Sequence, residues 1–441
     1  MMAHALYTLL WRLLTPCFLL RLLWRSRRQP DYRRHWGERL GFYGTALMQG
    51  KKEIPGVPAQ VARIWLHAVS VGEMRAAEPL VAALRTRYPA ATLILTCMTP
   101  TGRATAQALY GAMQNTRIVY LPYDLPGAVA RFLAGARPDL GLLLETEIWP
   151  NLLAAAQRHG IPVLLVNARL SRRSARGYAR VAPLLRPALR RLAAVAAQSK
   201  ADANRLALLG AGHIEVCGNL KFEVAPSAEL LAQGEVWRAA LGERPVLLAA
   251  STREGEEAML IAVWQRLRHP DVLLVIAPRH PERSADIETL AQGLGIPVKR
   301  RSAGMADAAT RLWLVDGFGE LPACYRMADV AFVGGSLAPL GGQNLIEAAA
   351  CACPVLVGPH TFNFARATGD AVAAGAARRI HDVEECAAAV NTLLENAALR
   401  QQMSAAALRF AASCRGATGR VMALIAAVIR EKEKGAQCST C

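Results

Sequence analysis

Acidic side chains gather in two short segments in the first half of the sequence. Glu73 ends the segment His67-Ala-Val-Ser-Val-Gly-Glu73, and a second segment reads Glu145-Thr-Glu147-Ile-Trp-Pro-Asn151. Carboxylates in such loops could deprotonate a hydroxyl group or stabilise a developing positive charge. A structural interpretation stays open for each segment, because an acidic side chain near a helix start caps the helix or complements its dipole.

The second half carries loops that are suited to bind a nucleotide. Val333-Gly-Gly-Ser336 follows an apolar run, and Gly341-Gly-Gln-Asn344 precedes a helical pattern that contains Glu347. Glycines let the backbone approach a ligand closely, and a helix N-terminus offers unpaired N–H groups to a phosphate. Glu347 could hold ribose hydroxyls, so these loops predict a nucleotide site.

Cationic side chains stand where they could neutralise a leaving phosphate. Arg279 lies in Pro278-Arg-His-Pro-Glu-Arg283, Arg253 ends Ala-Ser-Thr-Arg, and Lys221 ends Gly-Asn-Leu-Lys. Helix capping and an ordinary surface lysine are the alternative interpretations of these segments. We find no Asp-x-Asp pair after an apolar run and no His/Cys metal spacing. We therefore expect no metal and no cofactor, with N–H groups, Arg and Lys stabilising the leaving group.

Short apolar runs that precede these loops alternate with longer helical patterns, as in 74–88, 128–136 and 152–159. This alternation predicts an α/β fold of two doubly wound parallel sheets, with ligands in a cleft between their strand carboxyl ends. Residues 223–229 are the predicted linker, and 421–432 could pack back across the domains. The predicted strands are 64–69, 92–96, 117–121, 140–144, 163–166 and 193–197 in the first series, then 246–250, 272–277, 312–315, 330–333 and 354–357.

The N-terminal segment from Leu6 to Trp24 is mostly apolar, with Arg12 and Arg21 inside it and five arginines directly after it. Its length approaches the roughly 20 residues that cross a bilayer, so we predict membrane attachment. A spanning helix and a helix lying in one leaflet both stay open. The basic cluster would keep the following chain on the cytoplasmic side.

The composition favours anionic partners. A chain of 441 residues predicts two domains, and its formal net charge is +18. Proteins that bind nucleic acid usually carry aromatic residues among their basic ones, and this sequence has no such run. A high-arginine genome with solvated helix faces is the alternative explanation of the charge. Cysteines within apolar runs are typical of a reduced, cytoplasmic chain.

Taken together, seven segments resemble the 3-deoxy-D-manno-octulosonic acid (Kdo) transferases of Gram-negative bacteria, in order and over nearly the whole chain. The segments are His67-Ala-Val-Ser-Val-Gly-Glu73, Met98-Thr-Pro-Thr-Gly102, Tyr120-Leu-Pro-Tyr-Asp124, Glu145-Thr-Glu-Ile-Trp-Pro-Asn151, Asn167-Ala-Arg-Leu-Ser171, Pro278-Arg-His-Pro-Glu-Arg283 and Gly358-Pro-His-Thr-Phe-Asn-Phe364.

This resemblance implies the GT-B fold, with two Rossmann-like domains facing a cleft and an N-terminal membrane-anchor helix. It implies a membrane anchor with basic flank at 1–35, an acceptor domain at 36–225, a CMP-sugar domain at 226–435 and a tail at 436–441. The implied activity is inverting transfer of Kdo from CMP-Kdo to the lipid A precursor, lipid IVA, in lipopolysaccharide core synthesis. The implied location is the cytoplasmic face of the inner membrane, whose anionic surface is an implied partner. Nucleic acid is not an implied partner.

The resemblance also implies roles for particular residues. Glu73 matches the general base, Glu145 and Lys221 match positions that assist the transition state, and Glu147 lies beside them toward the acceptor. Gln343 replaces a histidine found in several relatives, so a charged role there is in doubt. The implied donor contacts are Pro278, Arg279, Phe318, Gly319, Glu320, Asn344, Leu345, Ile346 and Glu347.

Two other functions stay open. A GT-B transferase or 2-epimerase that uses a UDP-sugar would share the fold, and inhibition by UDP without inhibition by CMP would indicate it. A basic peripheral membrane protein that only binds acidic lipids would keep its function after Glu73→Ala.

Overall fold

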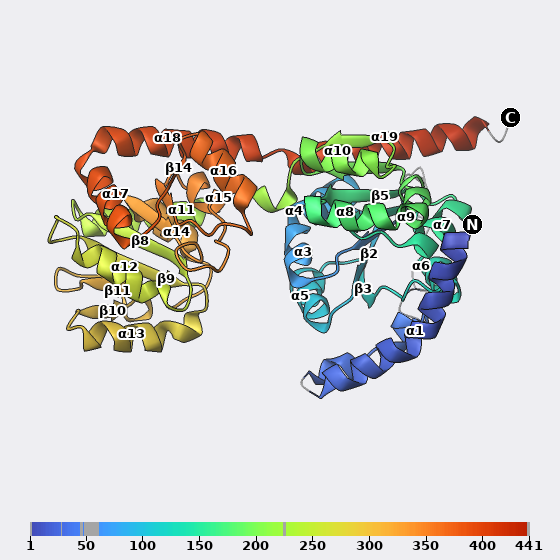
Figure 1. Ribbon diagram of the computed structural model, residues 1–441, viewed down its shortest axis with the longest axis horizontal. Coiled ribbons are helices and arrows are strands. Elements are labelled where there is room, and N and C mark those ends of the chain that lie inside the picture. The colour runs from blue at the N-terminus through green and yellow to red at the C-terminus, as the bar shows by residue number, and fades with distance from the viewer. Residues whose placement is uncertain (1, 28, 45–46, 48–60, 224–225, 439–441) are drawn as a thin grey trace. The chain divides into compact units, whose positions relative to one another are not determined.

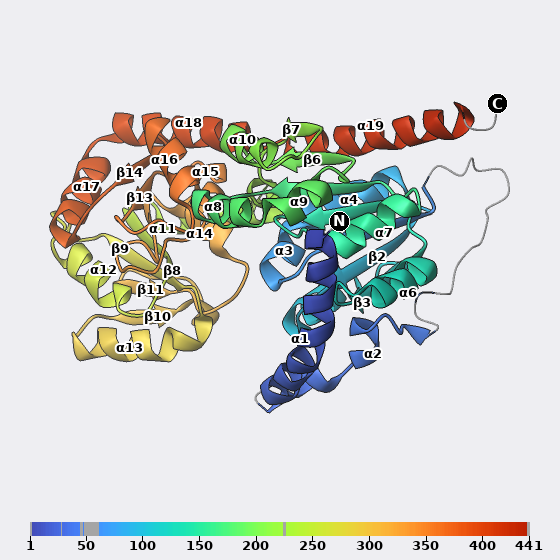
Figure 2. The same cartoon turned by 45° about the vertical axis from the view of Figure 1, so that its right-hand side comes forward.

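The computed structural model describes residues 2–27, 29–44, 47, 61–223 and 226–438 of the chain. They form two compact units (Figures 1 and 2). Met1–Glu223 and Gly416–Cys441 make up the first unit, and Val224–Arg415 make up the second. Each unit is built around its own seven-stranded parallel sheet.

The first sheet has the strand order β3-β2-β1-β4-β5-β6-β7, so the chain order reverses between β1 and β4. His67 at the end of β1 pairs with Thr96 on one side and Leu143 on the other. In doubly wound sheets, ligands bind beyond the strand carboxyl ends at such a reversal. The strands are β1 (Arg63–His67), β2 (Thr92–Cys97), β3 (Thr116–Tyr120), β4 (Leu140–Leu144), β5 (Val163–Ala168), β6 (Ala194–Ala197) and β7 (Ile214–Val216).

Helices pack on both faces of this sheet and give two apolar cores. Ile64 and Leu66 of β1 enter one core, while Trp65 enters the other beside Phe132, because successive strand residues point to opposite faces. The helices are α1 (Met2–Ser26), η1 (Pro30–Arg33), α2 (Trp36–Arg39), α3 (Val71–Ala76), α4 (Glu78–Arg87), α5 (Pro100–Tyr110), α6 (Pro126–Ala136), α7 (Pro150–Arg158), α8 (Arg172–Arg180), α9 (Ala182–Leu189), α10 (Lys200–Leu208) and η3 (Leu220–Phe222).

The second sheet has the order β10-β11-β9-β8-β12-β13-β14, with its reversal between β8 and β12. Its strands are β8 (Val246–Thr252), β9 (Leu273–Pro278), β10 (Val298–Arg300), β11 (Leu312–Leu314), β12 (Val330–Val333), β13 (Val355–Val357) and β14 (Ala377–Arg379). Its helices are α11 (Ala228–Leu241), α12 (Glu256–Gln265), η4 (Pro281–Arg283), α13 (Ser284–Gly293), η5 (Arg301–Ala303), α14 (Leu321–Met327), α15 (Ile346–Ala350), α16 (Ala365–Ala373), α17 (Val383–Glu395) and α18 (Ala397–Cys414).

The last helix corrects the domain limits expected from the sequence. The resemblance implies a second domain at 226–435, but the chain returns to the first unit at Gly416. Helix α19 (Ala417–Cys438) packs on α4, and Val421, Leu424 and Ile425 enter the core that contains Ile64. Apolar residues on one helix face require a covering surface, and here the first sheet's layer supplies it. Residues 224–225 of the predicted linker lie outside the described residues.

The eleven predicted strands all occur, and the structure adds β7, β10 and β14. The added strands have three residues each, and all three lie at sheet edges. The predicted helix at 74–88 is two helices, α3 and α4, that meet at Ala77. Proline at position 79 explains the break, since its ring disfavours a helix continuing through it.

Two described helical stretches, Met2–Ser26 and Ala397–Lys434, are long and apolar enough to cross a membrane by length and composition alone. Part of the second stretch is α19, whose apolar residues enter the core of the first unit. Helix α1 remains a candidate membrane anchor.

The pairing of β1 with β4 predicts the effect of one added methyl group. Gly141 of β4 faces Trp65, and a Cβ at Gly141 would lie 2.9 Å from Trp65 Cε3. We expect Gly141→Ala to lower the free energy of unfolding by about 1–3 kcal/mol, because the buried indole must shift. Gly177→Ala is the control, since nothing lies within 4 Å of its Cβ position. Equal thermal midpoints for the two variants would contradict this packing.

Candidate active site

Glu73 stands at the first turn of α3, directly beyond β1. Its carboxylate accepts hydrogen bonds from Val69 N (2.9 Å) and Ser70 Oγ (3.0 Å), while Ser70 Oγ accepts one from Glu73 N. This arrangement resembles a capping box, so the structural role expected for Glu73 is present. Burial raises the pKa of Glu73, and Glu145 raises it further. A raised pKa makes a carboxylate a stronger base near neutral pH.

Glu145 follows β4, the neighbour of β1, and is joined to Lys221. Lys221 Nζ lies 2.6 Å from Glu145 Oε1, although 76 residues separate the two along the chain. Glu145 has a φ of 59°, a left-handed conformation that costs a non-glycine residue roughly 1–2 kcal/mol. Its N–H bonds to Val166 O and extends the ladder between β4 and β5. The ladder and the ion pair hold this conformation.

Asn167 sets the position of Lys221. It lies fully buried at the end of β5, and its Oδ1 accepts a hydrogen bond from Leu220 N at 3.0 Å. Leu220 begins η3, and Asn219 Oδ1 accepts from Lys221 N in the same turn. The short helix that carries Lys221 is therefore fixed to the carboxyl edge of the sheet by an amide side chain.

The side chain of Glu147 is largely buried, with 23% of it exposed. Its Oε2 accepts a hydrogen bond from Trp149 Nε1 at 3.0 Å and lies 3.9 Å from Nε2 of the fully buried His67. Burial raises the pKa of Glu147 to about 7, and Glu73 adds to the rise. Burial also lowers the pKa of His67 to about 3, so its ring is neutral. Glu147 can therefore exchange a proton near neutral pH.

These contacts bring four of the expected residues together, namely Glu73, Glu145, Glu147 and Lys221. Their charges lie near one another. Glu73 raises the pKa of Glu147, while Glu145 raises and Lys221 lowers the pKa of Glu73. Carboxylates that repel one another keep a proton more readily, while one lysine offsets part of their charge. Such a set can remove a proton from a bound hydroxyl and stabilise cationic character nearby.

Helix α8 lies near Glu147 and is rich in arginine. Burial raises the pKa of Tyr178 on α8, and the charge of Glu147 raises it further. Helix α8 therefore lies close to Glu147. Arg172, Arg173, Arg176 and Arg180 on the same helix are all exposed. Exposed guanidinium groups bind phosphates, often through two hydrogen bonds each. A phosphorylated ligand bound near Glu147 would meet this helix.

In the second unit, two expected donor contacts approach each other. Burial raises the pKa of Glu347 on α15. The charge of Arg279, which follows β9, lowers this pKa by a smaller amount. Arg279 N also donates to Thr252 O at 3.0 Å, next to Pro278 at the end of β9. Asn344 Oδ1 accepts from Ile346 N, while Leu345 and Ile346 are buried. The side chains of Leu345 and Ile346 are therefore covered, and Ile346 N and Leu345 O already have hydrogen-bond partners within the chain.

Phe318, Gly319 and Glu320 form the turn before α14. Phe318 is 75% exposed, and Gly319 has a φ of 87° that favours glycine. Glu320 forms an ion pair with Arg301 at 3.1 Å. Within the described part of the chain, no hydrogen bond or ion pair joins this turn to Arg279 or Asn344.

The loop after β12 differs from the expectation. Glu256 is fully buried, and its carboxylate accepts N–H groups from Gly335 (2.6 Å), Ser336 (3.0 Å), Leu337 (3.0 Å) and Ala338 (3.3 Å). The backbone therefore forms an anion-binding nest, as expected for a Gly-Gly loop. However, a carboxylate of the chain occupies it, so these N–H groups are not free for a phosphate.

Sequence reasoning missed four buried polar residues that organise the loops: His67, Asp124, Asn167 and Glu256. Three of them stand inside the motif segments: His67 lies within the predicted strand 64–69, while Asp124 and Asn167 follow the predicted strands 117–121 and 163–166. That position was the available signal. No sequence signal marked Glu256, because a glutamate on the first turn of a helix is common. Among the described residues, no three His, Cys, Asp or Glu side chains cluster as metal ligands.

Comparisons with known proteins agree over nearly the whole chain. The model of 3-deoxy-D-manno-octulosonic-acid transferase (kdotransferase) matches residues 34–224, and that of glycosyl transferases group 1 matches residues 258–410. The chain is 44% identical over 431 residues to the 3-deoxy-D-manno-octulosonic acid transferase of Bordetella pertussis, covering 96% of this chain and 98% of the relative. The enzyme of the same name from Haemophilus influenzae is 34% identical over 429 residues, with 95% and 97% covered.

Solved structures extend the likeness to the fold. A putative UDP-N-acetylglucosamine 2-epimerase from Listeria monocytogenes aligns with a TM-score of 0.56 and covers 84% of this chain and 97% of its own. Its sequence identity is 16%, so the similarity concerns the two-sheet architecture alone.

The buried Glu147 predicts a pH dependence of stability. Its pKa is about 7 in the folded chain against an ordinary 4.5, so between these pH values the unfolded chain loses a proton that the folded chain keeps. The free energy of unfolding therefore falls as pH rises through that window. Glu147→Gln should remove this fall and become more stable than the parent by up to about 3 kcal/mol at about pH 8. Thermal midpoints between about pH 4.5 and 8 measure the difference.

The exposed Glu78 provides the matched control for this experiment. Glu78→Gln should follow the parent at every pH. Parallel curves for Glu147→Gln and the parent would contradict the raised pKa.

The nest around Glu256 predicts a large loss of stability on truncation. Glu256→Ala leaves the four N–H groups and that of Arg253 without an acceptor. We expect the free energy of unfolding to fall by at least about 3 kcal/mol, with Glu256→Gln intermediate, because an amide accepts through one oxygen only. Chemical denaturation measures both variants, and Glu254→Ala, at an exposed neighbour, is the control. A Glu256→Ala protein as stable as this control would refute the buried network.

Proposed function

The chain belongs to the 3-deoxy-D-manno-octulosonic acid (Kdo) transferase family, and we propose that it transfers Kdo from CMP-Kdo to lipid IVA with inversion of the anomeric configuration. It is a glycosyltransferase that transfers Kdo in lipopolysaccharide synthesis. The observation that carries the proposal is the 44% identity over 96% of the chain, together with three carboxylates and a lysine at the β1/β4 reversal.

Glu73 is the proposed general base. Its carboxylate is held by Val69 N and Ser70 Oγ, so it keeps one orientation, and burial raises its pKa. It takes the proton from an acceptor hydroxyl, whose oxygen then attacks the anomeric carbon of Kdo as CMP leaves. One direct displacement inverts the configuration. The proton moves to Glu73, and the bonding electrons leave with the phosphate of CMP.

Glu145 and Lys221 are the proposed supporting pair. Their 2.6 Å contact keeps both side chains in place, and together they bring a positive and a negative group near Glu73. A fixed carboxylate stabilises the oxocarbenium character that glycosyl transfer develops, and the lysine limits repulsion of the anionic donor. Glu147, which exchanges a proton near neutral pH, is the proposed acceptor contact.

The proposed acceptor is a phosphorylated lipid, and α8 suits it. Four exposed arginines occur within the nine residues of this helix, whose Tyr178 lies near Glu147. The net charge of +18 and the basic residues within and after α1 suit an anionic membrane surface. We place the enzyme at the cytoplasmic face of the inner membrane, attached through α1.

In the second unit, the proposed donor contacts are the backbone of Pro278, the side chains of Arg279 and Glu347, the turn at Phe318–Glu320 and the start of α15. Burial raises the pKa of Glu347, and Arg279 is close enough to lower it in part. Phe318 offers an exposed ring for stacking on a base. The proposed reaction needs no metal and no cofactor, since arginine, lysine and N–H groups can stabilise the leaving phosphate.

The activity is tested by the mass of the product. Protein incubated with lipid IVA, CMP-Kdo and EDTA should yield product heavier by one or more Kdo residues, and the increment counts the additions. We expect Glu73→Gln to lower the rate at least about 100-fold, because a general base is lost while a hydrogen-bonding group remains. Glu78→Gln, at an exposed residue one helix further on, should match the parent. No increment with the parent protein would refute the donor and acceptor, and an unchanged Glu73→Gln rate would refute the base.

The arginines of α8 predict a salt-dependent affinity. Replacing Arg172 and Arg176 with alanine should raise the KM for lipid IVA several-fold and weaken its dependence on salt, because fewer phosphate contacts remain. The value of kcat should change less. Arg158→Ala, at an exposed position at the far end of α7, is the control. Equal KM values for all three proteins would exclude α8 from acceptor binding.

A further inference from the structure

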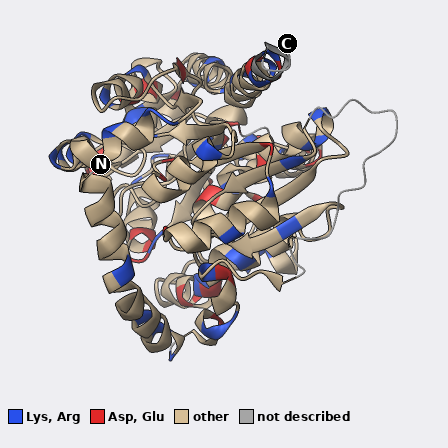
Figure 3. Cartoon of the chain, turned by 90° about the vertical axis from the view of Figure 1, so that its right-hand side faces the viewer, with Lys and Arg blue, Asp and Glu red and all other residues tan. Residues whose placement is uncertain are grey.

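Helix α1 has two different faces along its length. Leu6, Leu13 and Leu20 are between 58% and 64% exposed, whereas Tyr7, Trp11 and Phe18 are less exposed and contact one another. Residues spaced by three, four or seven positions share one side of a helix. The helix carries arginines but no acidic residue, as the absence of red along it shows (Figure 3). One side therefore faces outward, and the other is attached to the first unit.

Hydrogen bonds join the attached side to the start of α7. Asp124 is 1% exposed, and its Oδ2 accepts from Tyr7 Oη and from Asn151 N, each at 2.9 Å. Its Oδ1 accepts from Leu152 N at 2.8 Å. Asn151 and Leu152 lie in the first turn of α7, so one carboxylate caps α7 and holds α1 at the same time.

Aromatic rings join α1 to the acidic loop itself. The Trp11 ring stacks on Tyr123 at 5.8 Å and lies 6.2 Å from the ring of Trp149. Trp149 in turn donates to Glu147 Oε2 at 3.0 Å. A single side chain therefore separates α1 from a carboxylate of the candidate active site. We use the name α1 seam for the contact that Tyr7, Thr8, Trp11 and Phe18 make with the rest of the first unit.

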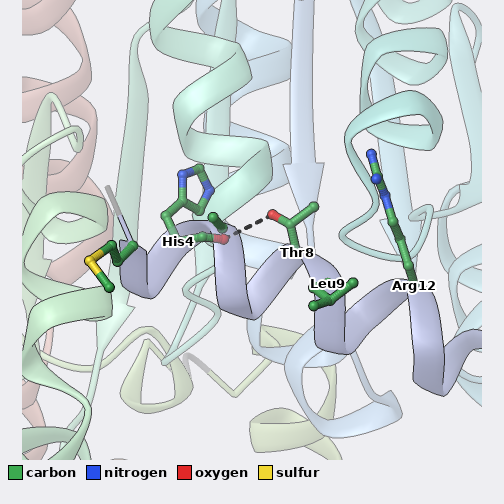
Figure 4. Close-up of a pocket in the computed structure, with 6 residues that line it drawn as sticks. His4, Thr8, Leu9 and Arg12 are labelled. Carbon is green, nitrogen blue, oxygen red and sulfur yellow. Dashed lines mark hydrogen bonds between the residues drawn. The ribbon is translucent and has the colours of Figure 1, made fainter.

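A surface hollow lies along the first turns of α1, next to the seam. Figure 4 shows His4, Thr8 and Arg12 projecting from α1 beside the neighbouring helices, with Thr8 Oγ1 bonded to His4 O. A hollow of about 560 Å³ lies here between Met2 and Arg12. Thr8 Oγ1 also lies 3.0 Å from Asn151 Oδ1. The attachment therefore depends on the residues from Tyr7 to Phe18.

We propose that α1 is a positioning element of the active site: Tyr7 and Trp11 hold α7 and Trp149, and through them the acidic loop that carries Glu147. This inference rests on the proposed function only in taking that loop as part of the active site. It assigns α1 a role that is separate from membrane attachment, because the attached face differs from the leucine face. Loss of the seam should change the chemistry even where no membrane is needed.

The test uses the full-length protein in detergent micelles, where recruitment to a membrane does not limit the rate. Tyr7→Phe removes one hydroxyl, and Trp11→Ala removes the ring between Tyr123 and Trp149. We expect Trp11→Ala to lower kcat about ten-fold or more, with a smaller loss for Tyr7→Phe, because small misplacements of active-site groups cost rate steeply. Trp11→Phe should restore most of the rate, since a phenyl ring can stack in the same place.

Leu13→Ala is the matched control, since Leu13 is 64% exposed on the opposite face of the same helix. It should keep the parent kcat in micelles. All variants should sediment with vesicles of anionic phospholipid as the parent does. Unchanged kcat for Trp11→Ala and Tyr7→Phe would overturn the proposal, as would an equal loss in Leu13→Ala. Absence of Kdo transfer by the parent protein would instead refute the proposed function.

Discussion

Strand β1 pairs with β4 as well as with β2, and this neighbour relation determines where the acidic side chains meet. Because β1 and β4 are distant in sequence and adjacent in the sheet, Glu73 and Glu145 emerge at the same edge. Gly141 permits the pairing by leaving room for the Trp65 ring. Asn167, one strand further along, then brings Lys221 to Glu145. Parallel pairing with reversed strand order is thus the constraint from which the site's geometry follows.

Buried carboxylates shape the loops in both units. Glu38 accepts from Tyr120 N and pairs with Arg103, Asp124 caps α7, and Glu256 fills the loop after β12. Each carboxylate satisfies backbone N–H groups that would otherwise be buried without a partner, which costs about 1–3 kcal/mol per group. A loop held in this way keeps its conformation without a ligand. The side chains proposed to be catalytic can therefore be arranged before substrate binds, which would lower the cost of reaching the transition state.

The sequence predicted the parts of the fold that are marked by buried apolar runs. The central strands were recognised because both faces are covered, so nearly every residue in them is apolar. β7, β10 and β14 were missed because edge strands are short and carry charged residues such as Glu215, Lys299 and Arg378. In the site, the loops after β1 and β4 were predicted. The contact of Lys221 with Glu145 and the capture of a Gly-rich loop by Glu256 depend on distant strands meeting, which no local pattern encodes. The catalytic roles themselves remain predictions.

The return of the chain at Gly416 makes the second unit an insertion within the first. A single proteolytic cut beside Val224 would therefore leave a C-terminal fragment that still carries α19. Val421, Leu424, Ile425 and Val428 of that helix are at most 4% exposed, and all four belong to the core of the first unit. Separating the two fragments would expose this apolar surface on both, at roughly 25 cal/mol for each Å². The nicked chain should therefore stay together as a complex of two fragments, much as two subunits share one core.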